Sequence, residues 1–197
     1  MTTHKLVMQA TGLVKRYGQV TALDGADFEL RAGEILAVIG DNGAGKSTLI
    51  KCVSGAIEPT SGDILFQGEP LPPGDPAGTL KRGIATIYQE LDLVPDLSVA
   101  ESVFLAHEPR RWPLLDLDKM YRESATLLAR LGHESIPVRA KVGQLRPAAQ
   151  QIVSIARALS GNVRLLIMDE PSAILDEGEV KTLFEVVRRL TAEGVGV

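Results

Sequence analysis

The residues best suited to chemistry stand in the stretch GDNGAGKST at positions 40–48. Its glycines let the backbone curve closely around an anion and point N–H groups inward. The spacing Gly-x4-Gly-Lys-Ser is that of a phosphate-binding loop, or P-loop. The predicted nucleotide ligands are therefore the residues of this loop: Gly40, Asp41, Asn42, Gly43, Ala44, Gly45, Lys46, Ser47 and Thr48.

Two side chains of the loop have distinct expected roles. Lys46 is expected to reach the β- and γ-phosphates of a nucleoside triphosphate, and Ser47 to give its oxygen to Mg²⁺. The alternative is a glycine-rich turn with an exposed lysine. That alternative does not explain why the lysine and the serine both fall at the required offsets.

A second acidic site follows the apolar run LLIM at 165–168. Asp169 would stand at the carboxyl end of a buried strand, where ligands of open α/β sheets bind, and would hold Mg²⁺ through its water shell. The adjacent Glu170 would polarise the attacking water. Alternatively, the pair is only a charged strand end before a turn.

The elements that must position these groups alternate between strands and helices, which predicts an α/β fold. Strands are expected at 28–30, 35–39, 63–67, 84–88 and 163–168, and a helix at 46–53. Segment 35–39 is apolar on both faces, as a buried parallel strand requires. The proline-rich stretch 69–78 is expected to be an exposed loop.

Between the last two strands the pattern becomes helical. Ser98 and Glu101 have the spacing of a capping box, one apolar helical face runs from Leu117 to Leu131, and a third helix covers 148–160. A last amphipathic helix carries Val180, Leu183, Phe184, Val187 and Leu190. This predicts a phosphate-binding core at about 1–89 and 161–197, with a helical subdomain at about 90–160.

Composition narrows the partners and the compartment. The 197 residues carry a net charge of −4 with scattered basic pairs, which argues against a nucleic-acid groove. The apolar runs are too short to cross a bilayer. A single cysteine, Cys52, and an N-terminus without an apolar signal core favour a cytoplasmic location.

In their order along the chain, these motifs resemble those of the ATP-binding cassette (ABC) ATPases. By that resemblance Tyr17 stacks on adenine, Gln89 in IYQEL senses Mg²⁺ and the γ-phosphate, and ILD at 174–176 is the D-loop. The signature, which contacts ATP bound by the opposite subunit, corresponds to Leu145, Arg146, Pro147, Ala148, Ala149 and Gln150. The implied fold is a P-loop NTPase (RecA-like) core with an inserted α-helical subdomain.

The resemblance also implies a function. GDNGAGKST, IYQEL and LSVAESVFLA look most like the ATPases of bacterial monosaccharide importers, for ribose, xylose or fructose. Such a subunit uses ATP and Mg²⁺, pairs with a second ATPase subunit as a homodimer, and docks on transmembrane permease subunits. It serves a substrate-binding protein indirectly and lies peripherally on the inner face of the cell membrane. Residues at about 90–105 resemble the surface that receives the permease.

Two departures from the family pattern stand out. The family signature is Leu-Ser-Gly-Gly-Gln, whereas here Arg146 replaces the hydroxyl and Pro147 has no N–H to donate. Arg146 either pairs with phosphate or is a solvated surface residue. The family also has a switch histidine after the D-loop, yet His4, His107 and His133 all precede Asp169. The expectation is therefore a C-terminally incomplete ATPase domain.

Two other classes of protein stay open as alternatives. A cassette ATPase of DNA repair or translation would carry a long coiled-coil insertion or tandem cassettes with basic linkers. A regulatory ATP-binding domain without hydrolysis is favoured by the altered signature. Co-purification with a permease separates the first alternative from a transport ATPase, and ATP turnover separates the second.

Overall fold

The computed structural model of the chain describes residues 5–88, 92–111, 113–171 and 175–197. The chain forms two compact units. Unit 1 contains Met1–Thr86, Val163–Asp169 and Leu190–Val197, and unit 2 contains Ile87–Asn162 and Glu170–Arg189. Residues 170–189 thus group with the helices rather than with the phosphate loop, and the domain boundaries expected from the sequence stay a prediction.

Unit 1 is built on an antiparallel sheet with the strand order β2-β1-β3-β4. Its strands are β1 (Leu6–Tyr17), β2 (Val20–Arg31), β3 (Ser61–Phe66) and the two-residue β4 (Glu69–Pro70). The predicted strand segments 28–30 and 63–67 fall largely in β2 and β3. One face of this sheet buries apolar side chains that include Met8, Leu13 and Ile64.

The phosphate loop leads into helix α1 (Lys46–Val53), as the sequence predicted. Cys52 and Val53 at the end of α1 join the buried cluster of the sheet. The same apolar contacts that form the core therefore fix the C-terminal end of α1, while the N-terminal end faces solvent with an exposed Ser47.

Two short strands, β5 (Ile84–Ile87) and β8 (Leu165–Met168), form a second sheet. A parallel bridge joins Leu165 to Gly196 beside it. Helix α2 (Pro76–Arg82) precedes β5, and Asp75 caps it by accepting from the N–H of Gly78 at 2.9 Å. The stretch 69–78 is largely exposed, as expected, but it is not a plain loop, because it holds β4, the buried Leu71 and the start of α2.

The predicted strand at 35–39 is not formed. Only its beginning pairs: the N–H of Leu36 donates to Val197 at 2.8 Å, and the N–H of Val197 donates to Glu34 at 2.9 Å. From Ala37 to Ile39 no backbone hydrogen bond to another described residue occurs, and Ile39 is 91% exposed. Apolar pattern alone does not make a strand, because a strand needs a neighbour along its whole length.

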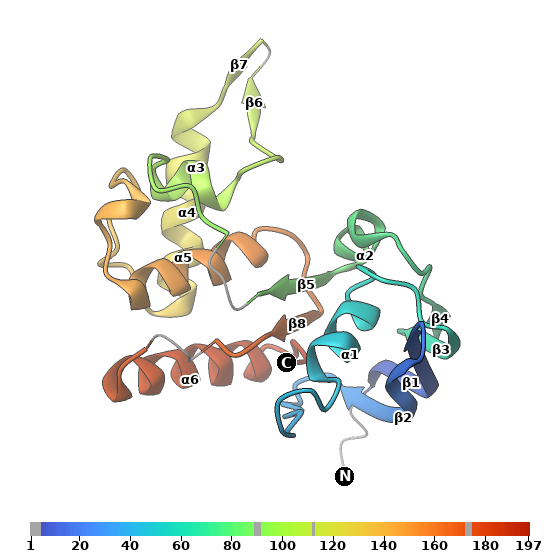
Figure 1. Cartoon of the computed structure of the whole chain (residues 1–197). Helices are drawn as coiled ribbons and strands as arrows, with labels where there is room; N and C mark the ends of the chain where they lie inside the picture. The colour runs from blue at the N-terminus through green and yellow to red at the C-terminus, as the bar shows by residue number, and fades with distance from the viewer. Residues whose placement is uncertain (1–4, 89–91, 112, 172–174) are drawn as a thin grey trace. The chain divides into compact units, whose positions relative to one another are not determined.

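Unit 2 is mainly helical (Figure 1). It contains α3 (Val99–Val103), α4 (Leu117–Leu131), α5 (Pro147–Ala158), a 3₁₀ turn at Val142–Gln144 and most of α6 (Glu177–Ala192). Both halves of the predicted capping box are present at α3, and α4 ends at Gly132 in the left-handed conformation. In α6 the predicted Leu183, Val187 and Leu190 are buried, whereas Phe184 is 53% exposed and Val186, which was not predicted, is buried.

Unit 2 also contains a hairpin that the helical pattern did not predict. Strand β6 (Arg110–Arg111) pairs antiparallel with β7 (Leu114–Leu115) between α3 and α4. Within the described ranges, none of the helices has both the length and the apolar character needed to cross a bilayer.

Candidate functional site

The phosphate loop is shaped by two glycines in the left-handed region. Gly43 and Gly45 both have φ 89°, and Gly45 is the N-cap of α1. A Cβ at Gly45 would overlap the carbonyl oxygen of Ala22 in β2, whereas a Cβ at Gly43 would meet nothing within 4 Å. Gly45 is therefore required both by its backbone angle and by the close approach of β2.

Lys46, the first residue of α1, connects the end of the phosphate loop to its beginning. Its Nζ donates to the carbonyl oxygens of Gly40 at 2.7 Å and Asp41 at 3.1 Å. A turn hydrogen bond from Ala44 to Asp41 at 3.1 Å holds the middle of the loop. The first turn of α1 carries no acidic residue, so the helix N-terminus offers unopposed positive potential to an anion.

Tyr17, the predicted adenine contact, ends β1 with its side chain 49% exposed. It pairs with Val20 across the turn to β2, and Val20 is 65% exposed. Nζ of Lys15 lies 5.2 Å from the centroid of the Tyr17 ring. An exposed aromatic ring beside an exposed valine suits the stacking of a base. Motif spacing did not indicate Val20, because its place beside Tyr17 depends on the pairing of β1 with β2.

The predicted acidic pair stands at the end of β8. Asp169 is partly buried, belongs to unit 1 like the phosphate loop, and makes no hydrogen bond or ion pair with a described residue. Glu170 is exposed and has φ 46°, a strained conformation for a residue with a side chain.

The predicted signature residues lie in unit 2, at the start of α5. Leu145 and Arg146 are extended, Arg146 is the N-cap without a side-chain cap, and Pro147 opens the helix. Nε2 of Gln150 donates back to the carbonyl oxygens of Val142 at 3.2 Å and Leu145 at 3.1 Å. This amide fixes the turn before α5, a structural role that spacing alone did not indicate.

The same helix start leaves two possible donors for an anion. Pro147 has no N–H, as expected, but Ala148 and Ala149 follow it in the first turn, and their N–H groups have no intrahelical acceptor. Arg146 is exposed beside them and forms no ion pair with a described residue. No acidic residue occupies this turn. The altered sequence therefore still offers positive potential at this end of α5.

Two predicted sites fall wholly or partly outside the described residues. Gln89 lies in the gap at 89–91, and the D-loop begins in the gap at 172–174. The last D-loop residue, Asp176, is described. Its Oδ1 accepts from the N–H of Glu179 at 2.8 Å, and its own N–H donates to Glu179 Oε2 at 3.1 Å, so it caps α6.

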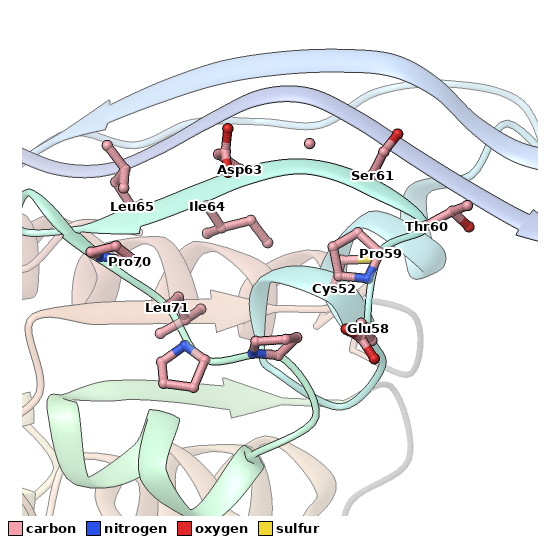
Figure 2. Close-up of a pocket in the computed structure, with 13 residues that line it drawn as sticks. Cys52, Glu58, Pro59, Thr60, Ser61, Asp63, Ile64, Leu65, Pro70 and Leu71 are labelled. Carbon is pink, nitrogen blue, oxygen red and sulfur yellow. The ribbon is translucent and has the colours of Figure 1, made fainter.

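A separate hollow of about 350 Å³ lies beside β3 in unit 1. Figure 2 shows Pro59, Ile64 and Leu71 around it, with Cys52 contributed by α1. None of the predicted nucleotide ligands lines this hollow, so it is separate from the phosphate loop. Burial raises the pKa of the Cys52 thiol, and the charge of Lys15 opposes this rise only in part.

Comparison with known proteins agrees with this geometry. The family model described as ABC transporter matches residues 23–173. The fold is also that of a solved ATP-binding cassette of an ABC transporter in its ADP conformation. That structure has a TM-score of 0.83 and 25% sequence identity over 96% of this chain and 78% of its own.

Curated relatives are more similar in sequence. A ribose import ATP-binding protein of Streptomyces avermitilis is 50% identical over 97% of this chain and 36% of its own length. A galactofuranose transporter ATP-binding protein of Escherichia coli is 42% identical over 100% of this chain and 40% of its own length. The chain thus spans less than half the length of these relatives. With most of its residues matched by the family model, this chain belongs to the ABC transporter family.

Proposed function

We propose that this chain is the ATP-binding and ATP-hydrolysing part of an ABC importer for a sugar. The observation that carries the proposal is the loop at 40–48. There two left-handed glycines, the ammonium of Lys46 and the N-terminus of α1, which has no acidic residue in its first turn, lie in one short loop, the arrangement that binds phosphate. The names of the relatives, which include ribose and galactofuranose transport, support a sugar as the substrate.

Mg²⁺ fits the oxygen donors of this site. The exposed Ser47 and Asp169, whose carboxylate has no partner among the described residues, both belong to unit 1, and Gln89 is the third proposed contact. Oxygen ligands of this kind, completed by water and phosphate, are what Mg²⁺ prefers. When bound, Mg²⁺ would neutralise charge that develops on the β- and γ-phosphate oxygens.

The residues of the chain would then divide the work. Lys46 would release Gly40 and Asp41 and donate to phosphate oxygens instead, while Tyr17 and Val20 would hold the base. Glu170 would orient and polarise the attacking water. The first turn of α5 with Arg146 would complete the site of a second ATPase subunit, since the signature of one subunit meets the ATP of the other. Transmembrane permease subunits and, through them, a substrate-binding protein are the proposed further partners, and the inner face of the membrane is the proposed location.

The test is ATP turnover by the chain assembled with its permease. We expect Mg²⁺-dependent phosphate release, and we expect Glu170→Gln to keep ATP binding while it slows single-turnover hydrolysis by about 100-fold or more, the typical effect of losing a general base. Glu177→Gln, an exposed carboxylate in the first turn of α6, is the matched control. Equal hydrolysis by the Glu170 variant and the parent would remove Glu170 from this role.

A second function is favoured by one observation. Pro147 supplies no N–H at the start of α5, so the contact to the opposite nucleotide has one donor fewer than a glycine would give. An ATP-binding subunit without hydrolysis would then bind nucleotide normally and show no phosphate release even with the permease. The turnover assay above separates these two functions.

A further inference from the structure

Lys15 contacts the ring of Tyr17, the residue proposed to hold the base. The two residues are two positions apart in β1, a spacing that places their side chains on the same face of a strand. Nζ of Lys15 lies over the Tyr17 ring, 5.2 Å from its centroid. An ammonium within about 6 Å of a ring centroid is attracted to the negative face of the ring. Lys15 therefore covers one face of this ring and favours one of its orientations.

A hydrogen bond fixes the ammonium of Lys15 over the ring. Its Nζ donates to the carbonyl oxygen of Glu58 at 2.6 Å. Glu58 belongs to the loop between α1 and β3, and Figure 2 shows it there with Thr60. Lys15 is partly buried along this path. The side chain thus extends from β1 to the loop, and its charged end has a defined place.

The loop that holds this ammonium is itself bound to β1 and to α1. The N–H of Thr60 donates to the carbonyl oxygen of Val14 at 2.7 Å, and Thr60 Oγ1 accepts from the N–H of Arg16 at 3.0 Å. The N–H of Ile57 donates to the carbonyl oxygen of Lys51 in α1 at 3.1 Å. The loop is therefore fixed between strand β1 and the helix that begins at the phosphate loop.

The strand opposite Lys15 lies close to the other end of α1. Lys15 pairs with Leu23 of β2. Leu23 is buried, and its Cδ2 would lie 3.1 Å from a Cβ added at Gly45, the N-cap of α1. The carbonyl oxygen of Ala22, the neighbour of Leu23, approaches the same position more closely. The contacts of Lys15 and of its strand partner therefore connect Tyr17 to both ends of α1, and so to the phosphate loop.

We propose that Lys15 is a positioning residue for the base of the bound nucleotide, which it orients through the ring of Tyr17. The inference rests on the proposed function, in which Tyr17 and Val20 hold the base of ATP. Tyr17 ends β1 and is 49% exposed, so a contact that restrains its rotamer matters for its orientation. A ring already held in its bound orientation loses less conformational entropy when a base stacks on it. The face of the ring opposite Lys15 is left for the base.

Two other roles of Lys15 predict different results. If Lys15 only held the loop at Glu58, its loss would weaken ligand binding by unit 1 in general. If its ammonium contacted phosphate directly, its loss would weaken the binding of a phosphate chain with or without a base. A residue that acts through Tyr17 changes the base-dependent part of the affinity and leaves the phosphate-dependent part as it was.

The test compares two ligands of the 197-residue chain in the presence of Mg²⁺: ATP, and inorganic triphosphate, which has the phosphate chain but no base. Affinities are measured by isothermal titration calorimetry. We expect Lys15→Met, which keeps the apolar stem and removes the charge, to weaken ATP binding by about three- to fivefold, the typical contribution of an exposed cation–π contact. Its affinity for inorganic triphosphate should change by less than about 1.5-fold, which also shows that the variant is folded.

Two further substitutions serve as rescue and control. Lys15→Arg keeps a cation over the ring and a donor for Glu58, so it should bind ATP as the parent does. Lys5→Met removes an exposed lysine next to the start of β1 and should change neither affinity by more than about 1.5-fold. Loss of ATP affinity in Lys15→Arg as large as in Lys15→Met would contradict a role of the positive charge.

A double-mutant cycle shows whether Lys15 acts through Tyr17. Tyr17→Leu alone should weaken ATP binding by at least about fivefold, because base–aromatic stacking is lost. In that background Lys15→Met should change ATP affinity by less than about 1.5-fold, since no ring remains to be positioned. A loss as large as in the parent background would overturn the proposal. So would an equal loss of ATP and triphosphate affinity in Lys15→Met, or no loss of either.

Failure of this inference and failure of the proposed function give different results. A chain whose ATP affinity depends on Tyr17 but not on Lys15 rejects the role of Lys15 alone. A parent chain that binds neither ligand rejects the proposed function, and the inference with it. A parent chain that binds ATP and inorganic triphosphate equally keeps its phosphate site, but it has no base contact for Lys15 to support, and this also overturns the inference.

Discussion

Nζ of Lys46 lies 2.7 Å from the carbonyl oxygen of Gly40, so the lysine side chain joins the two ends of the phosphate loop. The second bond, to Asp41 at 3.1 Å, holds the ammonium on the same side. A phosphate must replace these two carbonyl oxygens as the acceptor of the Lys46 ammonium. The lysine thus has a structural partner before a nucleotide arrives, and its removal should affect binding and loop order together.

Lys46→Ala should weaken the binding of a fluorescent ATP analogue by at least about tenfold, because a hydrogen bond to a charged group contributes about 1.5–3 kcal/mol. The fold should persist, since Lys46 is not part of the buried cluster. Lys51→Ala, near the other end of α1, is the matched control and should bind normally. An affinity of the Lys46 variant within about threefold of the parent would contradict the assignment of the phosphate site.

Gly45→Ala and Gly43→Ala separate backbone strain from crowding. Both glycines have φ 89°, so both variants should lose about 1–2 kcal/mol in free energy of unfolding. Only at Gly45 does the new methyl group overlap Ala22, and it also approaches Leu23 Cδ2 at 3.1 Å. Urea unfolding should show the larger loss for Gly45→Ala. Equal losses for the two variants would mean that β2 shifts to accommodate the methyl group without a further loss of stability.

The capping box of α3 should make stability depend on pH. Ser98 hydrogen bonds, through its side chain and its N–H, lower the pKa of Glu101 below its ordinary value of 4.5. A carboxylate with a lowered pKa stabilises the fold above the unfolded value, and the gain is lost as the pH falls through the folded value. The stability difference between the parent and Glu101→Gln should therefore shrink below about pH 4.5.

The controls for this prediction are simple. Ser98→Ala removes the cap at every pH and should cost about 1 kcal/mol at neutral pH. Glu58→Gln changes an exposed carboxylate for which the described residues provide no side-chain hydrogen bond. Thermal unfolding of the parent and each variant is measured between pH 3 and pH 7. If the stability difference between the parent and Glu101→Gln did not change with pH, the charge of Glu101 would have no part in the cap.

The unpaired segment Ala37–Ile39 should promote self-association of the 197-residue chain. It joins free backbone donors and acceptors to exposed apolar side chains, the combination that templates edge-to-edge pairing. Ile39→Lys should reduce association in sedimentation velocity. Leu80→Lys removes a 56% exposed leucine from helix α2, where the backbone is paired, and should have little effect. A larger effect of Leu80→Lys would point to simple apolar contact instead.

Arg146→Ser with Pro147→Gly should restore a hydroxyl and an N–H at the start of α5. In the chain assembled with its permease, the variant should show stronger ATP-driven dimerisation or faster turnover, since the opposite nucleotide gains two donors. Arg122→Ser, an exposed arginine of α4, is the control. No gain in either assay would mean that Arg146 with the N–H groups of Ala148 and Ala149 already closes the site.

The sequence predicted those features that local residues decide. Ser98 and Glu101 cap α3 and Gly132 ends α4 because each depends on a few neighbours in the chain. It failed where distant partners decide. The apolar residues at 35–39 indicated burial but did not indicate which strand would pair with them. The pairing of Arg110 with Leu115 depends on a turn at Pro113, which an analysis of helical periodicity does not detect. The amide bonds of Gln150 likewise required the conformation of the preceding turn.

Burial of Cys52 has a consequence for following this protein in solution. The thiol is 1% exposed, and its raised pKa keeps it protonated at neutral pH, so alkylating reagents meet a slow nucleophile in the folded chain. Because it is the single cysteine of the sequence, its modification rate reports those openings of unit 1 that expose this thiol. When opening and closing are fast relative to labelling, that rate measures the free energy of local opening around α1. Labelling of Cys52 therefore measures the local stability of α1, the helix that begins at the phosphate loop.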